Sequence, residues 1–441
     1  MEHDVKKISP LSPHDNIVEA DCGRDKSLTH RAIMFSALAE GQSTIKNPLL
    51  GADCVSTMDC FKALGVSFQV RDNEIIVNSP SWQGFKSPAT PLDCGNSGTT
   101  ARLISGLLAG IPGLTCTLVG DKSLSQRPMM RVVAPLRNMG ADITGEDGGN
   151  KLPLKIKGKK LRGTSIQIDK ATAQVKSAVI LAGLYCDGQT KVTLPKGSRD
   201  HTENILRMLG IPCKSEFDSK NELVSLTGPS TIKPSNYNIP VDPSSAAFFC
   251  VYGLLRPSGR TRILNVLANP TRTGFLQALK LMSQKITEKK PSSEQSFVET
   301  VVDIEVEGSF PLSGLTIMKD QVPTLVDEIP ILAVAAAFAK SPSVFMGLAE
   351  LRVKESDRLT KTHELLTLAG CSCEIRGDDL HIEGGLSKVK AFTFDSEGDH
   401  RLAMAGAILA KFANEPSKIL EGSCVNVSFP NFYQELEKFE A

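Results

Sequence analysis

Leu64-Gly65 is followed by the alternating stretch Val66-Ser67-Phe68-Gln69-Val70 and, after a turn, by Glu74-Ile75-Ile76-Val77. A glycine after leucine is typical of a helix end, because glycine adopts the left-handed conformation without strain. The alternation of apolar and polar residues predicts two strands joined by a turn. The same order returns at Ala369-Gly370 and the stretch from Cys371 to Ile382. The chain therefore repeats a unit in which a helix is followed by a strand pair.

This unit recurs six times. Each copy begins with a polar start and an apolar helical run, then continues with a strand, a second helix and two further strands. The apolar anchors late in the first helices lie about seventy residues apart, as in a repeated supersecondary unit. These anchors are Leu38, Leu108, Leu184, Leu254, Phe338 and Leu409. The first helices should begin near Lys26, Asn96, Thr172, Asp242, Asp327 and Gly398. The second helices should end at Leu64-Gly65, Met139-Gly140, Leu209-Gly210, Leu281-Met282, Ala369-Gly370 and Leu436 to Phe439.

The repeats predict an α/β protein with two domains of three copies each. One domain should span residues 24–240, and the other should combine residues 1–23 with residues 241–441. Ile239-Pro240-Val241-Asp242-Pro243 is stiff enough to be one crossover, and Asp21 to Arg24 would form the second. Ser283 to Thr300 is rich in Lys, Glu, Ser and Gln, so a surface loop is expected there.

The amino-acid composition indicates which kinds of molecule the chain can bind. With 441 residues, 41% of them hydrophobic, and a net charge of +1, the chain can bury a large core but lacks the excess charge of a nucleic-acid binder. The eleven cysteines show no CxxC pairs, which disfavours structural zinc and a disulfide framework and favours a reducing cytosol. No segment predicts a signal peptide or a membrane span. We expect a cytoplasmic protein that binds small molecules.

Cations stand in register at the helix starts. A cation near a helix N-terminus opposes the helix dipole, so an ordinary structural role is disfavoured for the set. Backbone N–H groups, guanidinium forks and ammonium groups together form sites for phosphate and carboxylate. The set comprises Lys26, Arg31, Arg102, Lys176 and Arg401 in first helices, and Arg127, Arg199, Arg272, Lys354 and Arg358 in second helices. The pattern predicts a substrate with several negative charges.

Two acids lie among these cations. Asp327 begins one first helix and Glu355 begins the next second helix, which favours proton transfer over simple capping. Capping is preferred for Glu328 and Asp357. The Gly-rich stretch from Gly95 to Thr100 lacks the ending of a P-loop, and the histidines show no metal-ligand spacing. Neither a nucleoside triphosphate nor a metal is predicted.

A series of motifs then resembles the EPSP synthase (3-phosphoshikimate 1-carboxyvinyltransferase) family across nearly the whole chain. The motifs are Asp25-Lys26-Ser27 with Arg31, Gly95-Asn96-Ser97-Gly98-Thr99, Ser125 to Met129, Ala173-Gln174-Val175-Lys176, Arg199-Asp200-His201-Thr202-Glu203, Asn269-Pro270-Thr271-Arg272, Asp327-Glu328-Ile329-Pro330, Lys354-Glu355-Ser356-Asp357-Arg358 and Asp399-His400-Arg401. Several of these versions resemble the bacterial class II branch. The chain departs from the family pattern at Cys22-Gly23-Arg24 and at Thr172.

The resemblance implies an inside-out α/β barrel of two domains, each built from three βαβαββ repeats with helices inside and sheets outside. It places the active site in the interdomain cleft. It implies transfer of the carboxyvinyl group of phosphoenolpyruvate to the 5-hydroxyl of shikimate 3-phosphate, with release of phosphate, on the pathway to chorismate and aromatic amino acids. No metal or other cofactor is expected, and neither is a nucleic-acid or membrane partner. We expect a monomer.

The resemblance also assigns residues. Asp327 would accept the hydroxyl proton, Glu355 would serve the methylene carbon, and Lys26 would assist at both substrates. The shikimate 3-phosphate set is Lys26, Ser27, Arg31, Thr172, Ala173, Gln174, Arg199, Asp327 and Lys354. The phosphoenolpyruvate set is Lys26, Gly98, Arg127, Gln174, Arg358 and Arg401. Because Gly98 is present, glyphosate is expected to occupy the phosphoenolpyruvate site, with Leu103 affecting its affinity.

Two other functions stay open at this point. UDP-N-acetylglucosamine carboxyvinyltransferase shares the implied fold and donor, but it typically has a cysteine in the loop before its Arg-Pro. The stretch from Asp121 to Pro128 contains none. A noncatalytic anion-binding repeat protein would carry the same cations and would use Asp327 and Glu355 only as caps. Turnover with release of phosphate distinguishes it from an enzyme.

Overall fold

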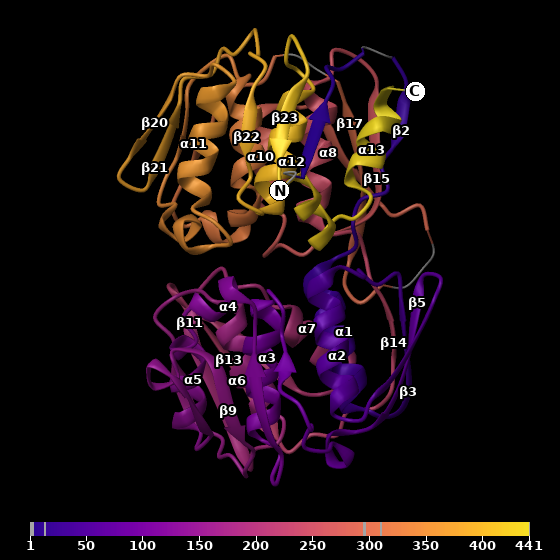
Figure 1. The fold of residues 1–441 in the computed structure, drawn as a ribbon, viewed down its shortest axis with the longest axis vertical. Helices are drawn as coiled ribbons and strands as arrows, with labels where there is room; N and C mark the ends of the chain where they lie inside the picture. The colour runs from indigo at the N-terminus through magenta and orange to yellow at the C-terminus, as the bar shows by residue number, and fades with distance from the viewer. Residues whose placement is uncertain (1–3, 13–14, 294–296, 309–310, 441) are drawn as a thin grey trace. The chain divides into compact units, whose positions relative to one another are not determined.

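The computed structural model describes residues 4–12, 15–293, 297–308 and 311–440. Contacts divide the chain into two compact units. We call Asp25–Ile239, together with a short stretch at Val298, the amino-half unit, drawn mainly in indigo and magenta in Figure 1. The segment up to Arg24 and most of the chain from Pro240 onward form the carboxy-half unit, drawn mainly in orange and yellow except for its indigo N-terminal strands.

The amino-half unit consists of short helices packed with three four-stranded sheets. Its helices are α1 (Lys26–Leu38), α2 (Ala52–Ala63), α3 (Gly98–Ala109), α4 (Lys122–Gln126), α5 (Met130–Asn138), α6 (Ala173–Gly183) and α7 (His201–Met208). Its strands are β3 (Glu40–Lys46), β4 (Ser67–Arg71), β5 (Glu74–Pro80), β6 (Leu92–Asp93), β7 (Thr115–Val119), β8 (Asp142–Glu146), β9 (Lys151–Lys157), β10 (Ser165–Gln167), β11 (Gly188–Pro195), β12 (Cys213–Phe217), β13 (Asn221–Gly228) and β14 (Asn236–Asn238).

The carboxy-half unit has a similar composition of elements. Its helices are α8 (Pro243–Leu255), α9 (Gly274–Met282), α10 (Ile329–Ala337), α11 (Arg358–Leu368), α12 (His400–Ala410) and α13 (Phe432–Glu437). Its strands are β1 (Val5–Ile8), β2 (Ile17–Glu19), β15 (Arg260–Leu267), β16 (Ile286–Lys289), β17 (Val301–Glu307), β18 (Thr316–Ile317), β19 (Ser343–Phe345), β20 (Cys373–Arg376), β21 (Asp379–Ile382), β22 (Thr393–Asp395) and β23 (Ser417–Leu420). A 3₁₀ turn at Val326–Glu328 precedes α10, and another at Ala349–Val353 precedes α11.

All the four-stranded sheets in the described chain share one strand order. In β10-β11-β13-β12, for example, the first pair is parallel and the other two pairs are antiparallel. The sheet β22-β23-β1 has three strands, with one parallel and one antiparallel pair. Two sheets take their parallel edge strand from a distant part of the chain: β14 pairs with β3, and β2 pairs with β15. In each unit, one sheet therefore contains an edge strand that lies far along the chain from the other strands of that sheet.

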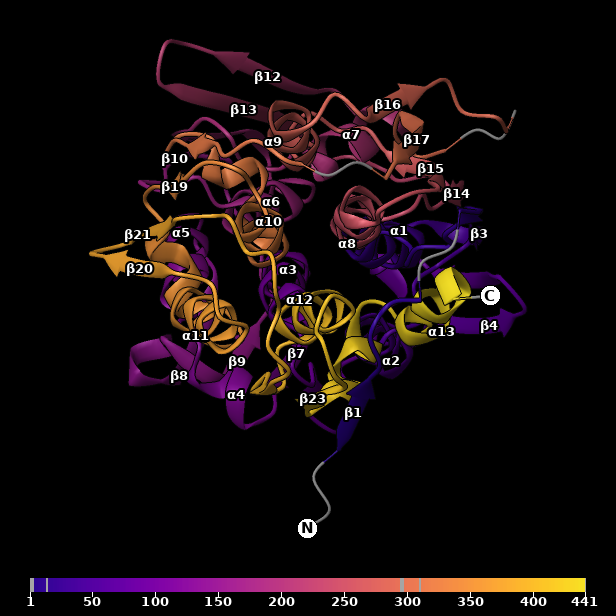
Figure 2. The ribbon, with the colours of Figure 1, turned by 90° about the horizontal axis from the view of Figure 1, so that it is seen from above.

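The predicted first helices are confirmed to within about two residues, the usual uncertainty of a helix boundary. Asp242 and Asp399 cap α8 and α12 by accepting hydrogen bonds from backbone N–H groups. Every residue of α8, α10 and α12 is buried, and beyond their first turns these helices are apolar on all faces. The three helices pack against one another and lie close together in Figure 2.

The predicted ends of the second helices are also confirmed. Positive φ angles occur at the residue after the C-cap of α2, α5, α7 and α11, namely Gly65, Gly140, Gly210 and Gly370. Only glycine takes this backbone conformation without strain, so each helix stops where the sequence predicts. The strands predicted after Gly65 and Gly370 form as the antiparallel pairs β4–β5 and β20–β21.

The loop predicted from Ser283 to Thr300 is wrong in its first half. Residues Ile286–Lys289 form the edge strand β16, which pairs with β17. Lys289 forms an ion pair with Glu305 of β17 at 3.0 Å. Charged side chains are common on edge strands because they discourage pairing with other chains, and this polarity gave the segment its loop-like composition. Residues 294–296 of the predicted loop lie outside the described residues.

The cysteines are part of the packed interior. All eleven are free thiols, and nine of them are buried. Burial raises the pKa of Cys116 and Cys371 to about 12, so these thiols stay protonated and behave as small apolar side chains. Within the described residues, no helix combines the length and apolar character that crossing a membrane requires.

Candidate active site

The start of α1 carries the first predicted group of site residues. Asp25 caps the helix by accepting a hydrogen bond from the backbone N–H of Leu28 at 2.7 Å. The Nζ of Lys26 lies 3.1 Å from Asp53 Oδ2 in the first turn of α2, and both side chains are largely buried. Ser27 follows at the second helical position and is partly exposed. The cap and the Lys26–Asp53 pair therefore place one cation and one hydroxyl at the same helix end.

Arg31 is buried one turn further along α1, with 4% of its surface exposed. Its Nε donates to Thr202 Oγ1 at 2.8 Å, and its Nη2 donates to Ser177 Oγ at 2.9 Å. Its Nη1 donates to the carbonyl oxygen of Ser27 at 3.0 Å. Arg31 thus joins the start of α1 to α6 and α7, a structural role that the sequence did not predict.

A chain of buried hydroxyl groups joins α1 to α2 and α3. His30 Nδ1 lies 2.7 Å from Thr57 Oγ1, which lies 2.7 Å from Thr100 Oγ1. Thr100 Oγ1 donates to Ser97 Oγ at 2.7 Å, and Ser97 caps α3. The starts of α1 and α3, which carry Lys26 and Gly98, are therefore tied together through α2.

The buried side chain of His30 makes the stability of the amino-half unit depend on pH. Burial lowers its pKa from 6.5 to about 3, and Lys26 and Arg31 add to that effect while Asp53 opposes it. The neutral ring is stabilised in the folded state, so this stability is present above pH 6.5 and is lost as the pH falls toward 3. In urea titrations, the difference in unfolding free energy between wild type and His30→Gln should shrink by about 1.4 kcal/mol per pH unit below pH 6. Parallel pH curves for the two proteins would contradict this assignment.

The start of α3 and the start of α6 meet through Arg102. Its Nη1 donates to Gln174 Oε1 at 2.5 Å, and Gln174 Nε2 donates to Thr99 Oγ1 at 3.1 Å. A Cβ atom at Gly98 would lie 3.0 Å from Arg102 Nη1 and 3.6 Å from Arg127 Nη1. Gly98 therefore leaves space directly beside two guanidinium groups, as an anion site requires.

Arg127, the second guanidinium group beside Gly98, is held by polar side chains of neighbouring segments. Its Nη2 donates to Asn96 Oδ1 at 2.7 Å and lies 3.4 Å from Ser123 Oγ. Asn96 Nδ2 in turn donates to Asp121 Oδ2 at 2.6 Å. These contacts orient a partly exposed guanidinium group toward the backbone of Gly98.

The remaining predicted residues of this unit lie near the starts of α6 and α7. Thr172 occupies the N-cap position of α6, but its side chain makes no capping hydrogen bond. Ala173 and Gln174 form the first turn of that helix, and Arg199 lies in the segment before α7. All four residues are partly exposed.

The expectation that Lys176 and Arg272 face substrate anions is wrong. Lys176 is fully buried, with its Nζ 2.5 Å from Glu203 Oε1 and 3.1 Å from Glu222 Oε1. Burial raises the pKa of Glu222, and the Lys176 charge opposes that effect. Arg272 is also buried and lies 2.8 Å from Asp242 Oδ1. Both cations are neutralised by carboxylates of the protein. For Lys176 the signal was available, since it lies within the apolar run of α6.

In the carboxy-half unit, the buried Arg358 joins three carboxylates. Its Nε donates to Asp399 Oδ2 at 2.7 Å, its Nη1 to Asp327 Oδ1 at 3.0 Å, and its Nη2 to Glu355 Oε2 at 2.6 Å. Burial lowers the pKa of Arg358, but Asp399, Glu355 and Asp327 outweigh it and raise the pKa above its usual value. The guanidinium group thus orients both predicted catalytic acids. Asp399 is the member of this cluster for which the sequence predicted no role.

Asp327 has two further cations nearby. Lys354 Nζ lies 3.8 Å from Asp327 Oδ1, and Arg401 Nη2 lies 3.8 Å from Asp327 Oδ2. The segments that carry these groups are the 3₁₀ turn at Val326–Glu328, the residue after the 3₁₀ turn at Ala349–Val353, and the start of α12. Predicted residues from three separate chain segments therefore meet around one carboxylate.

The two acids expected to act as caps differ. Asp357 caps α11 by accepting a hydrogen bond from the backbone N–H of Thr360 at 3.1 Å, which confirms the expectation. Glu328 makes no side-chain cap, so that expectation is wrong. Its buried carboxylate instead accepts a hydrogen bond from Ser244 Oγ on α8. This contact joins the turn before α10 to α8.

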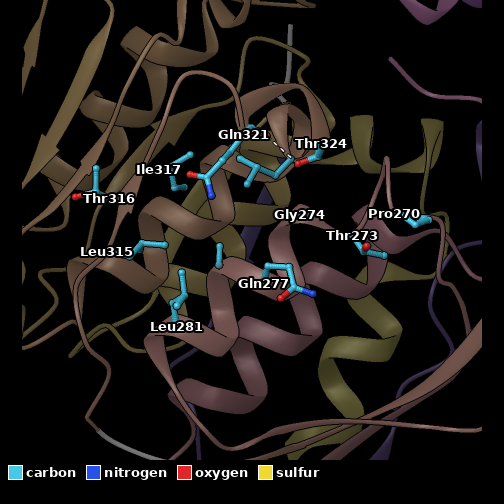
Figure 3. A pocket seen from close by; sticks show the side chains of 12 residues that line it. Pro270, Thr273, Gly274, Gln277, Leu281, Leu315, Thr316, Ile317, Gln321 and Thr324 are labelled. Carbon is cyan, nitrogen blue, oxygen red and sulfur yellow. Dashed lines mark hydrogen bonds between the residues drawn. The ribbon is translucent and has the colours of Figure 1, made fainter. Parts of the chain in front are cut away.

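A separate cavity of about 260 Å³ lies between α9 and the turns before α10. Figure 3 shows Gln277 of α9 and Gln321 and Thr324 of the turn segment at its lining. Its lining contains none of the predicted site residues. The candidate active-site residues of this unit are therefore grouped around Arg358 and not in this cavity.

Comparisons with known proteins identify the family of the chain. A family model described as EPSP synthase (3-phosphoshikimate 1-carboxyvinyltransferase) matches residues 17–436. A curated protein of Persephonella marina named 3-phosphoshikimate 1-carboxyvinyltransferase is 40% identical over 438 residues and covers 99% of each chain. One of the same name from Gloeobacter violaceus is 44% identical over 415 residues and covers 94% of each. The solved EPSP synthase of Acinetobacter baumannii superposes with a TM-score of 0.86 at 36% identity, covering 98% of both chains. The chain therefore belongs to the EPSP synthase family, whose activity is that of a 3-phosphoshikimate 1-carboxyvinyltransferase.

Proposed function

We propose that the chain transfers the carboxyvinyl group of phosphoenolpyruvate to the 5-hydroxyl of shikimate 3-phosphate by addition and elimination. Family membership supports the overall reaction. The observation that carries the mechanism is the Arg358 cluster, because a single buried guanidinium group orients both Asp327 and Glu355. Two carboxylates held close together in this way suit a reaction with two proton transfers.

In the addition step, the 5-oxygen of shikimate 3-phosphate bonds to C2 of phosphoenolpyruvate. Asp327 takes the proton of the hydroxyl group, and Glu355 gives a proton to the methylene carbon, which becomes a methyl group. In the elimination step, the bond between C2 and the phosphate oxygen breaks, and the leaving phosphate takes up the proton that Asp327 had accepted. The methyl group returns a proton to Glu355, which restores the vinyl group. Arg and Lys side chains can stabilise the phosphate charge throughout, so the reaction needs no metal or redox cofactor.

The substrate residues are proposed as the motifs assign them. Shikimate 3-phosphate would bind Lys26, Ser27, Arg31, Thr172, Ala173, Gln174, Arg199, Asp327 and Lys354. Phosphoenolpyruvate would bind Lys26, Gly98, Arg127, Gln174, Arg358 and Arg401. The space beside Gly98 supports an anion there, and the cations around Asp327 support another. The two sets would serve one pair of substrates.

We propose the corresponding architecture of six βαβαββ repeats, arranged as an inside-out barrel in two domains with helices inside and sheets outside. The common strand order of the four-stranded sheets supports the repeats. The complete burial of α8, α10 and α12 supports the inner position of the helices. We further propose a class II enzyme that works as a monomer in the cytoplasm.

The test is release of phosphate from purified protein given both substrates. Phosphate should appear only when shikimate 3-phosphate and phosphoenolpyruvate are both present, and glyphosate should compete with phosphoenolpyruvate. Replacing shikimate 3-phosphate by UDP-N-acetylglucosamine should give no phosphate above background. Phosphate release with the nucleotide sugar alone as acceptor would contradict the proposal, and binding of both substrates without turnover would favour a noncatalytic protein.

A further inference from the structure

A fully buried ion cluster joins three elements of the amino-half unit. Lys176 of α6 lies 2.5 Å from Glu203 of α7 and 3.1 Å from both oxygens of Glu222 on β13. None of the three side chains is more than 3% exposed. Their position below the surface leaves no route for direct contact with a substrate, so any effect on catalysis must pass through neighbouring residues.

A second polar junction lies directly beside the first. Ser177 follows Lys176 on α6, Thr202 precedes Glu203 on α7, and the two hydroxyl groups lie 2.7 Å apart. Both accept hydrogen bonds from Arg31 of α1. The helices α6 and α7 are therefore fixed to each other at two successive positions, and α1 is fixed to the same junction.

The elements joined here carry the segments proposed to bind shikimate 3-phosphate. These segments are Lys26-Ser27 at the start of α1, Thr172 to Gln174 at the start of α6, and Arg199 before α7. Ser198 also donates a hydrogen bond to Glu222 Oε2 at 3.4 Å, which ties the Arg199 segment to the cluster. Gly98 and Arg127, proposed for phosphoenolpyruvate, lie instead near the contacts of Asn96 and Asp121.

Stability alone is a weak explanation for this cluster. Moving charges out of water is costly, and well-packed apolar residues often serve a fold equally well or better than a buried ion pair. Fixed geometry is the better explanation, because an ion pair with three short contacts defines the register of α6, α7 and β13. A shift of about 1 Å in groups that hold a substrate can change turnover by about 10²-fold.

We infer that Lys176, Glu203 and Glu222 are positioning residues that set the geometry of the shikimate 3-phosphate site. This inference rests on the proposed function. It assigns to the cluster a larger effect on shikimate 3-phosphate than on phosphoenolpyruvate. Lys26 and Gln174 are proposed for both substrates, but the other four residues of the phosphoenolpyruvate set lie outside the elements that the cluster joins; they are Gly98, Arg127, Arg358 and Arg401.

The test compares wild type with the triple variant Lys176→Met, Glu203→Gln and Glu222→Gln, which removes all three charges and leaves no unpaired ion. KM for shikimate 3-phosphate should rise about tenfold or more, while KM for phosphoenolpyruvate changes less than about threefold. Val224→Ala is the matched control, because it removes buried apolar volume from the same strand and leaves all three charged residues in place. It should leave the ratio of the two KM values unchanged.

The inference is overturned if the two KM values of the triple variant change equally or if neither changes. It is also overturned if Val224→Ala changes the ratio of the two KM values as much as the triple variant does. Should the triple variant fail to fold, Glu222→Gln alone should raise KM for shikimate 3-phosphate about threefold, and an unchanged value would overturn the inference as well. Wild-type protein that releases no phosphate would overturn the proposed function. If wild type releases phosphate and the variants have unchanged KM values, only the inference is overturned.

Discussion

Asp327→Asn should lower kcat by about 10³-fold while leaving the protein folded, because a general base contributes about 10²- to 10⁴-fold to a proton-transfer reaction. Asparagine has nearly the same shape as aspartate and can still accept a hydrogen bond from Arg358, whose Nη1 lies 3.0 Å away. It cannot take the proton of the 5-hydroxyl group. The measurement is steady-state release of phosphate at saturating concentrations of both substrates, with the thermal unfolding midpoint as a check on folding.

Glu350→Gln is the matched control for this change. Glu350 lies 3.3 Å from Lys354, which is also the partner of Asp327, but its side chain is 59% exposed. Removing its charge should change kcat by less than about threefold, since exposed ion pairs contribute little. If Asp327→Asn also stays within about threefold of wild type, Asp327 is not the base.

Much of the fold could be predicted from the sequence because its signals are local. The caps at Asp242 and Asp399 and the glycines at Gly65 and Gly370 are each read from a few adjacent residues. Strand β14 is different, because it completes a sheet with β3 almost two hundred residues earlier in the chain. Strand β16 was missed because its charged residues suit an edge strand and a loop equally well.

The sequence singled out residues that the structure brings together around Asp327, but it did not predict the contacts among them. Lys176 and Arg358 are both cations near helix starts, and the apolar run around Lys176 indicates that its side chain is buried but not which residues it contacts. Lys176 meets Glu222, which is 46 residues away, and Arg358 meets Asp399, which is 41 residues away. Tertiary packing alone shows that the first cation is enclosed by protein carboxylates and that the second orients the candidate catalytic acids.

Arg358→Met should lower the free energy of unfolding by about 3–5 kcal/mol, because removing one partner of a buried ion pair leaves uncompensated charge. Three carboxylates lose a hydrogen-bond donor in this variant, and Asp399 is fully buried. Arg358→Lys should lose less, since it keeps a charge but cannot reach three acceptors from one nitrogen. Both variants should also lose more than about 10²-fold in turnover, because Asp327 and Glu355 lose their orientation.

A second substitution separates this electrostatic account from a simple loss of packing. Asp399→Asn keeps the cap of α12, because asparagine caps a helix about as well as aspartate. In the wild-type background it should be destabilising, because it removes a charged partner of Arg358. In the Arg358→Met background it should be stabilising, because it removes a buried charge that has lost its partner. Urea denaturation of the four proteins gives the coupling free energy. If Asp399→Asn lowers stability equally in both backgrounds, the three carboxylates do not depend on Arg358 for their charge balance.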